Sequence, residues 1–244
     1  MEDYILKKIL FYISLIVARV CYLTLRVTKL SSGTAFIGLI VLKICPSFLK
    51  YANKYVTKSK INITGTNGKT TTSAITAHVL KKLNKDIIYN STGANMLTGV
   101  VNSMSLQINP FKPSEYSVIE ADEAHLGKIY DKFSADYLLV TNLFEDQLDR
   151  YGSLENTRNL IQKAIDKNPD LQLILNADDP FIVMMKSNKE PVFYGVESVT
   201  YDDGVNYIDN SVPYKCTCGE NLTYAKRFYS KIGHYSCLKA DSNP

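Results

Sequence analysis

The stretch from Ile61 to Thr72 constrains the fold of this chain more than any other part of the sequence. It reads Ile-Asn-Ile-Thr-Gly-Thr-Asn-Gly-Lys-Thr-Thr-Thr, a short β-branched run followed by two glycines, a lysine and hydroxyl residues. This is the order of a strand, a phosphate-binding loop and a helix start. The usual spacing of a phosphate loop is only nearly met, because Ile63 stands where the first glycine would be. The stretch predicts nucleotide binding.

Each residue type in this loop has a part in the prediction. Gly65 and Gly68 allow the backbone to approach phosphate closely, and the N–H groups of the loop and of the following helix present positive dipole ends. Lys69 adds a full positive charge, and the hydroxyl of Thr70 or Thr71 would reach Mg²⁺. A glycine turn in a hairpin is the alternative. It is disfavoured because apolar residues continue on one helical face, namely Ile75, Val79, Leu80 and Leu83.

The 244 residues, of which 45% are hydrophobic, can bury a sizeable core and fit one large domain or one domain with attachments. Charge is unevenly distributed along them. Residues 1–60 carry ten Lys and Arg against two Asp and Glu, whereas the remainder carries 18 against 22. The two parts therefore face different surroundings. Five cysteines without a secretory cleavage pattern favour reduced thiols in the cytoplasm.

Residues 4–28 predict a helix, because apolar residues recur at roughly helical spacing with basic residues interleaved. The uncharged run from Ile9 to Ala18 is far shorter than the ~20 residues that a membrane span needs, and Arg19 interrupts it. Two alternatives stay open. The helix lies in the membrane interface, which makes the protein peripheral at the inner face of the membrane, or it packs on the domain that follows. Residues 34–43 and 47–56 predict two further helices.

Four apolar runs after the loop predict strands at residues 86–90, 116–120, 136–141 and 171–175. The second and third of these runs are apolar strands of the buried kind that end in polar residues, as expected where a parallel sheet opens its carboxyl edge to a ligand. Ser153 can cap a helix that runs to about Lys167. Strands that alternate with helices predict an α/β fold with a doubly wound, mostly parallel sheet.

Polar clusters follow three of the predicted strands, at residues 120–123, 142–150 and 176–180. The carboxyl ends of parallel strands share one edge of the sheet, so these clusters should converge on the phosphate loop. A carboxylate at such a position commonly holds the Mg²⁺ of a bound nucleotide, and Glu120 is the first choice. Asp122, Glu123 and Asp146 are alternatives for this role, or are solvated loop carboxylates.

Short segments of the chain resemble a known family. Three resemble the central ATP-binding domain of the Mur ligase superfamily: Thr64-Gly-Thr-Asn-Gly-Lys-Thr-Thr-Thr72, Asn142 through Arg150, and Asn176-Ala-Asp-Asp-Pro180. Three are similar to its MurT branch: Gly93-Ala-Asn-Met96, Glu120-Ala-Asp-Glu-Ala124 and Phe144-Glu-Asp-Gln-Leu-Asp-Arg-Tyr-Gly152. The resemblance covers about residues 17–240. Gln147 stands where many members have histidine, which favours MurT over folylpolyglutamate synthase.

The resemblance implies a site for ATP and Mg²⁺. It places on the phosphates Gly65, Thr66, Asn67, Gly68, Lys69, Thr70 and Thr71. It places Thr70 and Glu120 on Mg²⁺, and Asn176 with Asp179 near adenosine. The implied reaction is an amidation, in which the α-carboxyl of D-glutamate in the lipid II stem peptide becomes an acyl phosphate. Ammonia from a GatD-type glutaminase then gives D-isoglutamine.

The implied partners are this glutaminase and lipid II at the membrane surface, and no nucleic acid is expected. Two alternative functions remain. One is a folylpolyglutamate-type ligase, and the other is a non-catalytic nucleotide-binding or interaction remnant.

The cysteines near the C-terminus depart from the family. Cys216, Cys218 and Cys237 lie where MurT proteins carry a zinc ribbon, but Lys215 and Ala240 occupy two of the ligand positions. Structural zinc requires four ligands, so the pattern predicts little or no zinc. We expect instead a degenerate, ribbon-shaped hairpin held by aromatic residues, namely Tyr224, Phe228, Tyr229 and Tyr235.

The sequence thus predicts three parts. They are a basic helical segment at 1–58, a central ATP-binding domain at 59–210 and the ribbon insertion at 211–244. The resemblance places the catalytic aspartate in a C-terminal ligase domain that would follow. The chain ends before that domain, so we expect this chain alone not to amidate lipid II.

Overall fold

The computed structural model describes residues 2–28, 34–91, 93–144, 153–197, 215–216 and 219–237. The predictions made for Cys218 and for the segment 145–152, which includes Asp146 and Gln147, lie outside these residues. The same holds for the predicted boundary near residue 210.

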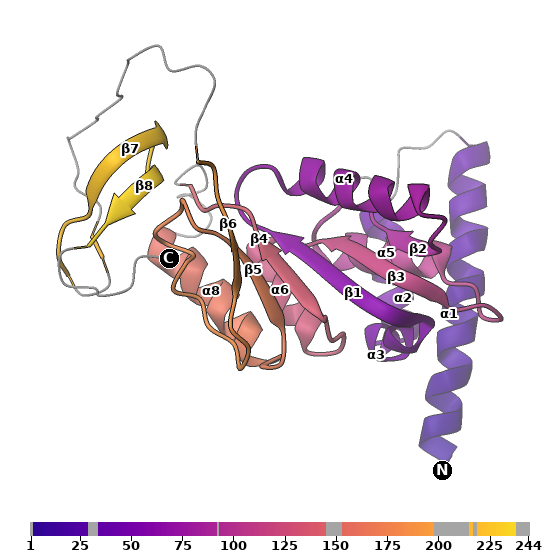
Figure 1. The fold of residues 1–244 in the computed structure, drawn as a ribbon. Coiled ribbons are helices and arrows are strands. Elements are labelled where there is room, and N and C mark those ends of the chain that lie inside the picture. The colour runs from indigo at the N-terminus through magenta and orange to yellow at the C-terminus, as the bar shows by residue number, and fades with distance from the viewer. Residues whose placement is uncertain are drawn as a thin grey trace.

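A parallel sheet of six strands forms the centre of the protein (Figure 1). Its order is β2 (Ile87–Tyr89), β3 (Ser114–Glu120), β1 (Val56–Thr64), β4 (Tyr137–Val140), β5 (Gln172–Asn176) and β6 (Val192–Tyr194). Every neighbouring pair is parallel. Ile63 near the end of β1 pairs with Glu120 on one side and with Leu139 on the other. The predicted fold class, a doubly wound α/β sheet with a phosphate loop, is confirmed.

The direction of each crossover decides which face a helix covers. The connection from β1 to β2 runs one way along the sheet, and it contains α4 (Lys69–Lys82). The connections to β3, β4 and β5 run the other way, and they contain α5 (Leu97–Gln107), α6 (Glu123–Tyr130) and α8 (Leu154–Asp166). Because such crossovers are right-handed, α4 lies on one face and the other three helices lie on the opposite face (Figure 1).

The N-terminal helices form a further layer outside α5. They are α1 (Glu2–Val27), α2 (Thr34–Ile44), α3 (Phe48–Ala52) and the 3₁₀ turn η1 (Asn53–Tyr55). Phe11 and Leu15 of α1 are buried, and the ring of Phe11 lies 5.1 Å from that of Phe48. Arg19 donates to the carbonyl of Ile108 at the end of α5, at 2.6 Å. The predicted N-terminal helices are confirmed, and this layer packs on the domain that follows.

Helix α1 is also long and apolar enough to be compared with a membrane span. By length and composition, Tyr4–Val27 is the one described helix that could cross a membrane, although such a helix near the N-terminus is weak evidence for a span. The bent pair formed by α2 with α3 and η1 passes the same criteria only when both halves are taken as one span. The sequence argument against a span considered only the uncharged run from Ile9 to Ala18. The whole helix, Tyr4–Val27, provides a longer apolar segment than that short run.

The face that helix α4 buries differs from the apolar face predicted from the sequence. The apolar spacing predicted the helix correctly, yet Ile75 and Val79 are 59% and 49% exposed. Its buried face carries Ser73 and Ala77 instead, with Leu80 partly buried. Small side chains let α4 lie close to the sheet near Ile63 and Val118.

The ribbon region contains the antiparallel hairpin β7 (Thr223–Tyr229) and β8 (Ile232–Ser236), beyond the β6 edge of the sheet (Figure 1). The rings of Tyr224 and Tyr235 lie 6.0 Å apart, as expected for a hairpin held by aromatic residues. The hairpin is fixed to the sheet by its backbone, because Gly233 N–H donates to the carbonyl of Asp178 at 3.0 Å.

Candidate nucleotide-binding site

The loop between β1 and α4 has the backbone shape that binds phosphate. Gly65 has φ +123° and Gly68 has φ +81°, both in the region that favours glycine. A side chain at position 65 would also collide with the sheet, because its Cβ would lie 2.3 Å from Oγ1 of Thr141. Gly68 is the N-cap of α4, and no side-chain oxygen caps that helix end. The first N–H groups of α4 therefore point from an uncapped helix start, where an anion is stabilised.

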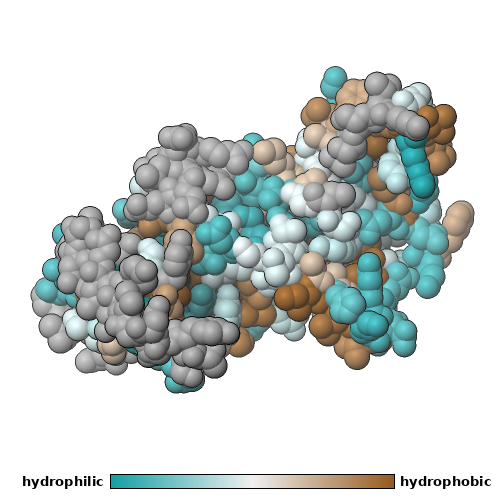
Figure 2. Space-filling view, turned by 90° about the horizontal axis from the view of Figure 1, so that it is seen from above, coloured by the Kyte–Doolittle hydropathy of each residue, from teal (hydrophilic) through white to brown (hydrophobic). Residues whose placement is uncertain are grey.

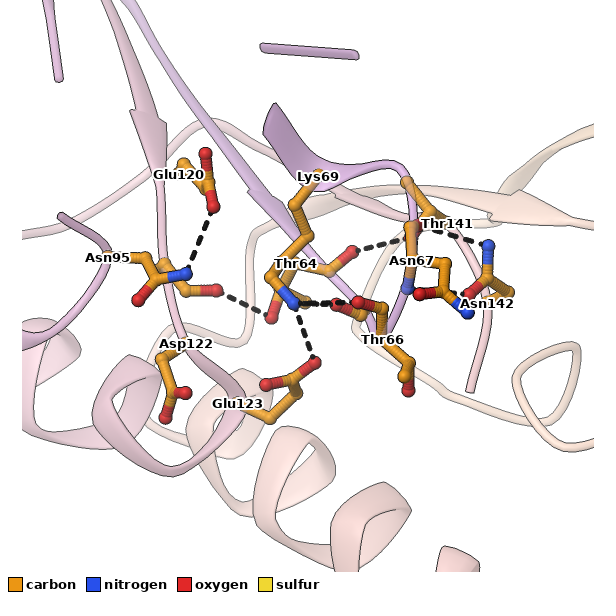
Figure 3. Close-up of polar contacts among 12 residues, drawn as sticks. Thr64, Thr66, Asn67, Lys69, Asn95, Glu120, Asp122, Glu123, Thr141 and Asn142 are labelled. Carbon is orange, nitrogen blue, oxygen red and sulfur yellow. Dashed lines mark hydrogen bonds and ion pairs between the residues drawn. The ribbon is translucent and has the colours of Figure 1, made fainter. Parts of the chain in front are cut away.

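The residues after β4 hold this loop in place. Thr66 N–H donates to the carbonyl of Asn142 at 2.8 Å, and Asn67 N–H donates to the Asn142 side chain at 2.9 Å. Thr141 donates from its hydroxyl to the carbonyl of Asn67 at 2.8 Å. Phe144 N–H donates to the hydroxyl of Thr66 at 2.9 Å. The loop is thus bonded along its length to the neighbouring strand end (Figure 3).

The Lys69 side chain folds back over the loop. Its ammonium donates to the carbonyls of Gly65 and Thr66 and pairs with Glu123, whose Oε1 lies 3.3 Å away (Figure 3). Both side chains are buried, with 8% of Lys69 and 2% of Glu123 exposed. Burial raises the pKa of Glu123, although the charge of Lys69 opposes that rise. The site therefore holds the positive charge of Lys69 beside the loop, close to the start of α4.

Glu120 is held by the loop that follows β2. Its Oε1 accepts from the side chain of Asn95 at 3.0 Å. The side chain of Asn90 bonds to both backbone groups of Glu120. It accepts from the Glu120 N–H at 2.8 Å and donates to the Glu120 carbonyl at 2.8 Å. Glu120 is buried at the edge of the sheet beside Lys69 (Figure 3).

Two carboxylate oxygens at this edge are suited to a cation. Oε2 of Glu120 and Oε2 of Glu123 are buried and make no hydrogen bond within the part of the chain that the structure describes. Buried carboxylate oxygens normally have partners, and oxygen is the ligand atom that Mg²⁺ prefers. Asp122 differs from them, because it is the N-cap of α6 and accepts from Ala124 N–H at 3.1 Å. The donor set therefore fits a magnesium ion at Glu120.

Asn176 and Asp179, predicted near adenosine, lie at the end of β5. Asn176 donates to the carbonyl of Thr141 at 3.2 Å, which joins it to the residues that hold the phosphate loop. The carboxylate of Asp179 is fully buried and accepts from the N–H groups of Leu143 and Phe181 at 2.9 and 3.0 Å. It also pairs with Lys231 of the hairpin at 3.4 Å. Burial raises the pKa of Asp179, and Lys231 opposes the rise.

A pocket of about 390 Å³ opens between this strand end and the hairpin. Its lining includes Ala177 and Asp178 beside the predicted adenosine residues, and the aromatic side chains of Phe193, Tyr194 and Tyr235. Its volume lies in the range of pockets that take small molecules.

Three residues that shape the site were not singled out from the sequence. Thr141 is the last polar residue of a predicted strand, so its position was a usable signal. Asn95 lies inside a segment that carried the family resemblance. Lys231 gave no signal, because nothing in the sequence shows that a hairpin lysine reaches a carboxylate 52 residues earlier.

The predicted zinc region is only partly described. Cys216 is half-buried and Cys237 is buried, and Cys218 lies outside the described residues. His234, the described histidine of this region, bonds through Nε2 to the carbonyl of Val196 at 2.8 Å. Within the described ranges, no three His, Cys, Asp or Glu side chains form a group that could hold a metal ion. The prediction of little or no zinc stays a prediction.

Comparison with known proteins identifies the class that this fold and loop define. Residues 63–224 match the Mur ligase middle domain family, and the chain belongs to that family. The MurT subunit of lipid II isoglutaminyl synthase (glutamine-hydrolyzing) from Staphylococcus aureus is 35% identical over 206 residues, which are 84% of this chain and 46% of that protein. The subunit of the same name from Streptococcus pneumoniae is 29% identical over 86% of this chain and 46% of its own length. The chain thus spans about half the length of these curated relatives.

Solved structures support the same fold. MurF from Acinetobacter baumannii matches with a TM-score of 0.52 and 17% identity, over 64% of this chain and 34% of that one. MurF from Thermotoga maritima, solved in complex with ADP, matches with a TM-score of 0.51 and 20% identity, over 65% of this chain and 37% of that one. The family resemblance expected from the sequence is confirmed.

Proposed function

We propose that this chain is the ATP-binding portion of a MurT-type amide ligase of peptidoglycan synthesis. The observation that carries the proposal is the loop from Gly65 to Lys69, with its uncapped helix start, its buried lysine and its neighbouring carboxylate Glu120. The MurT relatives, which match more than four fifths of the chain, favour this ligase over a folylpolyglutamate-type enzyme.

The loop binds the phosphates of ATP through the backbone N–H groups at the start of α4, from Gly68 to Thr71, because the N–H groups of Thr66 and Asn67 already donate to Asn142. Lys69 leaves the loop carbonyls and places its charge against the phosphoryl group that is transferred. Glu123 remains beside it and keeps the ammonium oriented, because the ion pair is buried. In this way the chain positions the phosphates and offsets their charge, which is most of what a protein contributes to phosphoryl transfer.

Glu120 and the hydroxyl of Thr70 would hold Mg²⁺. When bound, the ion neutralises charge on the phosphate oxygens. Asn95 donates to one carboxylate oxygen of Glu120 and Asn90 holds the Glu120 backbone, so that the other carboxylate oxygen stays available for a cation. The adenosine end lies towards Asn176 and the pocket beside Tyr194, since Asn176 is bonded to the strand end that holds the loop. Asp179 contributes there by accepting from the N–H groups of Leu143 and Phe181, which fixes the backbone at those two residues.

The substrate that we propose is the α-carboxyl of D-glutamate in lipid II, at the inner face of the membrane. The carboxylate attacks the γ-phosphorus of ATP, which releases ADP and forms an acyl phosphate. Ammonia from a GatD-type glutaminase then displaces phosphate and gives the amide of D-isoglutamine. The name of the MurT relatives, which describes a glutamine-hydrolyzing synthase and calls them subunits, supports a partner of this kind.

Titration calorimetry with Mg-ATP tests the nucleotide site. Lys69→Ala should weaken binding at least about a hundredfold, because it removes a charge-assisted contact to phosphate in a buried site. Lys82→Ala, an exposed lysine at the other end of α4, is the matched control and should bind as the wild type does. Equal affinity in the Lys69 variant and the control would show that the loop does not bind ATP phosphates.

The reaction is tested in the organism that encodes the chain. Cells whose copy carries Lys69→Ala should contain less D-isoglutamine and more D-glutamate in their stem peptides, as mass spectrometry of digested cell wall measures. An unchanged amidation level would remove the assignment to lipid II while leaving nucleotide binding intact.

A further inference from the structure

Helix α1 carries a continuous apolar stripe on the side that faces away from the protein. The stripe consists of Leu6, Ile9, Ile13, Ile16, Val20, Leu23 and Val27, whose exposed fractions run from 42% to 82%. These positions are alternately three and four residues apart, so they lie along one side of the helix. At 1.5 Å per residue the stripe is roughly 32 Å long.

The other side of α1 is committed to the protein. Phe11, Leu15 and Ala18 are buried, and Arg19 is bonded to the end of α5. Phe36 and Leu39 of the neighbouring helix α2 are also exposed. Hydrophobic residues gather at the end of the molecule that holds α1 (Figure 2). A folded protein rarely leaves such a contiguous apolar surface in water unless something covers it.

The charges around the stripe indicate what covers it. Lys8, Arg19 and Arg26 are 11 and 7 residues apart, which places them within about 20° of one another on one flank of the helix. Lys8 and Arg26 are exposed. No Asp or Glu occurs from residue 4 to residue 85. On α1 the acids Glu2 and Asp3 stand only at its start, before the stripe begins. An apolar stripe with a cationic flank matches the boundary between acyl chains and anionic headgroups.

We propose that this surface, the α1 stripe, docks in the plane of an anionic lipid bilayer. The apolar side chains enter the acyl boundary, and Lys8 and Arg26 reach the headgroups. The helix lies on the bilayer and does not cross it, because crossing would strip Phe11 and Leu15 from the core that they share with Phe48. A second copy of the chain is a poorer occupant, since parallel pairing would bring the cationic flanks together.

Flotation with lipid vesicles tests this proposal on the 244-residue chain. The wild type should float with vesicles of equal parts phosphatidylglycerol and phosphatidylcholine, and much less with phosphatidylcholine alone. The double variant Ile16→Gln with Val20→Gln should lower the partition coefficient at least about tenfold, because it removes apolar area from the stripe without touching the core. The matched control is Ile75→Gln with Val79→Gln on α4, where the side chains are similarly exposed, and it should float as the wild type does.

A second pair of variants tests the charge. Lys8→Gln with Arg26→Gln should weaken binding to the anionic vesicles roughly tenfold and leave the weak binding to neutral vesicles unchanged. Lys81→Gln with Lys82→Gln, two exposed lysines on α4, is its control and should have no effect.

Four results would each overturn the proposal. They are no flotation of the wild type, equal flotation of the stripe variant, and a vesicle-bound chain that resists alkaline carbonate, which would indicate a span. The fourth is a dimer in sedimentation analysis that the stripe variant abolishes, which would make the surface an interface between copies. The proposal deepens the proposed membrane location, yet flotation needs no nucleotide, so failure of the ATP assignment in the Lys69→Ala variant would leave it unaffected.

Discussion

The ion pair between Lys69 and Glu123 sets a pH dependence at the scale of single residues. Burial raises the pKa of Glu123 above its ordinary value, so the folded state holds its proton more tightly than the unfolded chain does. The stability that this group contributes is complete below its ordinary pKa of about 4.5 and is lost as the pH rises through its folded-state pKa. Above that point the buried carboxylate is charged and lowers the free energy of unfolding.

Glu123→Gln should therefore gain stability relative to the wild type as the pH rises from mildly acidic to neutral. The gain is about 1.4 kcal/mol for each pKa unit by which burial has raised the pKa of Glu123. Urea unfolding at a series of pH values measures it, with Glu155→Gln on the exposed side of α8 as the control. A difference between the Glu123 variant and the wild type that stays constant with pH would contradict the raised pKa.

Glu120 should differ from Glu123 in what its loss affects. Glu120→Gln keeps the bond to Asn95 but removes the negative charge that a cation requires. Its affinity for ATP should then be similar with Mg²⁺ and with a chelator, whereas the affinity of the wild type should fall at least about tenfold when the metal is removed. Calorimetry in the two buffers measures this. A normal response to Mg²⁺ in the Glu120 variant would place the metal elsewhere.

The sequence could predict which residues gather at this edge but not what each one contacts. Glu120 follows a strand of recognisable pattern, so its place beside the loop was predictable. The burial of Glu123 was not, because it depends on the first turn of α6 meeting the Lys69 side chain. Likewise, the position of Asp179 followed from the resemblance, whereas its two distant partners, Leu143 and Lys231, follow from how the hairpin and the Leu143 backbone come together.

At the scale of elements, the close approach of α2 to α5 depends on one glycine. A Cβ at position 38 would lie 1.9 Å from the carbonyl oxygen of Thr98, which no side-chain rotation can relieve. Gly38→Ala should therefore lower the free energy of unfolding by about 2 kcal/mol or more, because the backbones must separate.

Gly127→Ala in α6 is the matched comparison. The nearest atoms to its Cβ are Nζ of Lys167 at 3.6 Å and Cβ of Ala164 at 3.9 Å, which is ordinary contact. This substitution should raise stability by about 0.5 to 1 kcal/mol, because alanine favours the helix more than glycine does. Urea unfolding of both variants measures the two signs. Similar small effects in both would show that α2 and α5 are not closely packed at Gly38.

Helix α4 shows the limit of predicting elements from apolar spacing. The spacing of Ile75, Val79 and Leu83 correctly indicated a helix, but it did not indicate which face is buried. The face towards the sheet is set by the phosphate loop, because Lys69 and Ser73 must point inward from the first turns. The short strand β6 was not predicted, since its three residues are exposed and carry no pattern of burial.

At the scale of the whole molecule, the parallel sheet was predictable from strands that alternate with helices, because few topologies satisfy that pattern. The division into segments 1–58, 59–210 and 211–244 stays a prediction. The attachment of the hairpin was not predictable, since it depends on contacts between segments far apart in the sequence. Gly233 bonds to Asp178, and Lys231 reaches Asp179.

Lys231 is the residue through which the hairpin reaches the phosphate loop. Its side chain is 1% exposed, lies over the ring of Phe181 at 4.0 Å and pairs with the fully buried Asp179. Asp179 holds the N–H of Leu143, and the next residue, Phe144, donates to the hydroxyl of Thr66 in the loop. A change at Lys231 should therefore affect both stability and nucleotide binding.

Lys231→Met should lower the free energy of unfolding by about 3 kcal/mol, because it leaves the carboxylate of Asp179 buried without its cation. The same change at Lys215, an exposed lysine of the ribbon region, should cost far less. Adding Asp179→Asn to Lys231→Met should cost less than the two single changes together, since the uncompensated charge is then gone. Urea unfolding of the wild type, Lys231→Met, Asp179→Asn and the double variant measures the coupling energy between the two residues. Calorimetry should show weaker ATP binding by Lys231→Met, because the Leu143 backbone is less firmly held. Additive effects, or equal stability of the Lys231 and Lys215 variants, would mean that the buried pair does not join the hairpin to the nucleotide site.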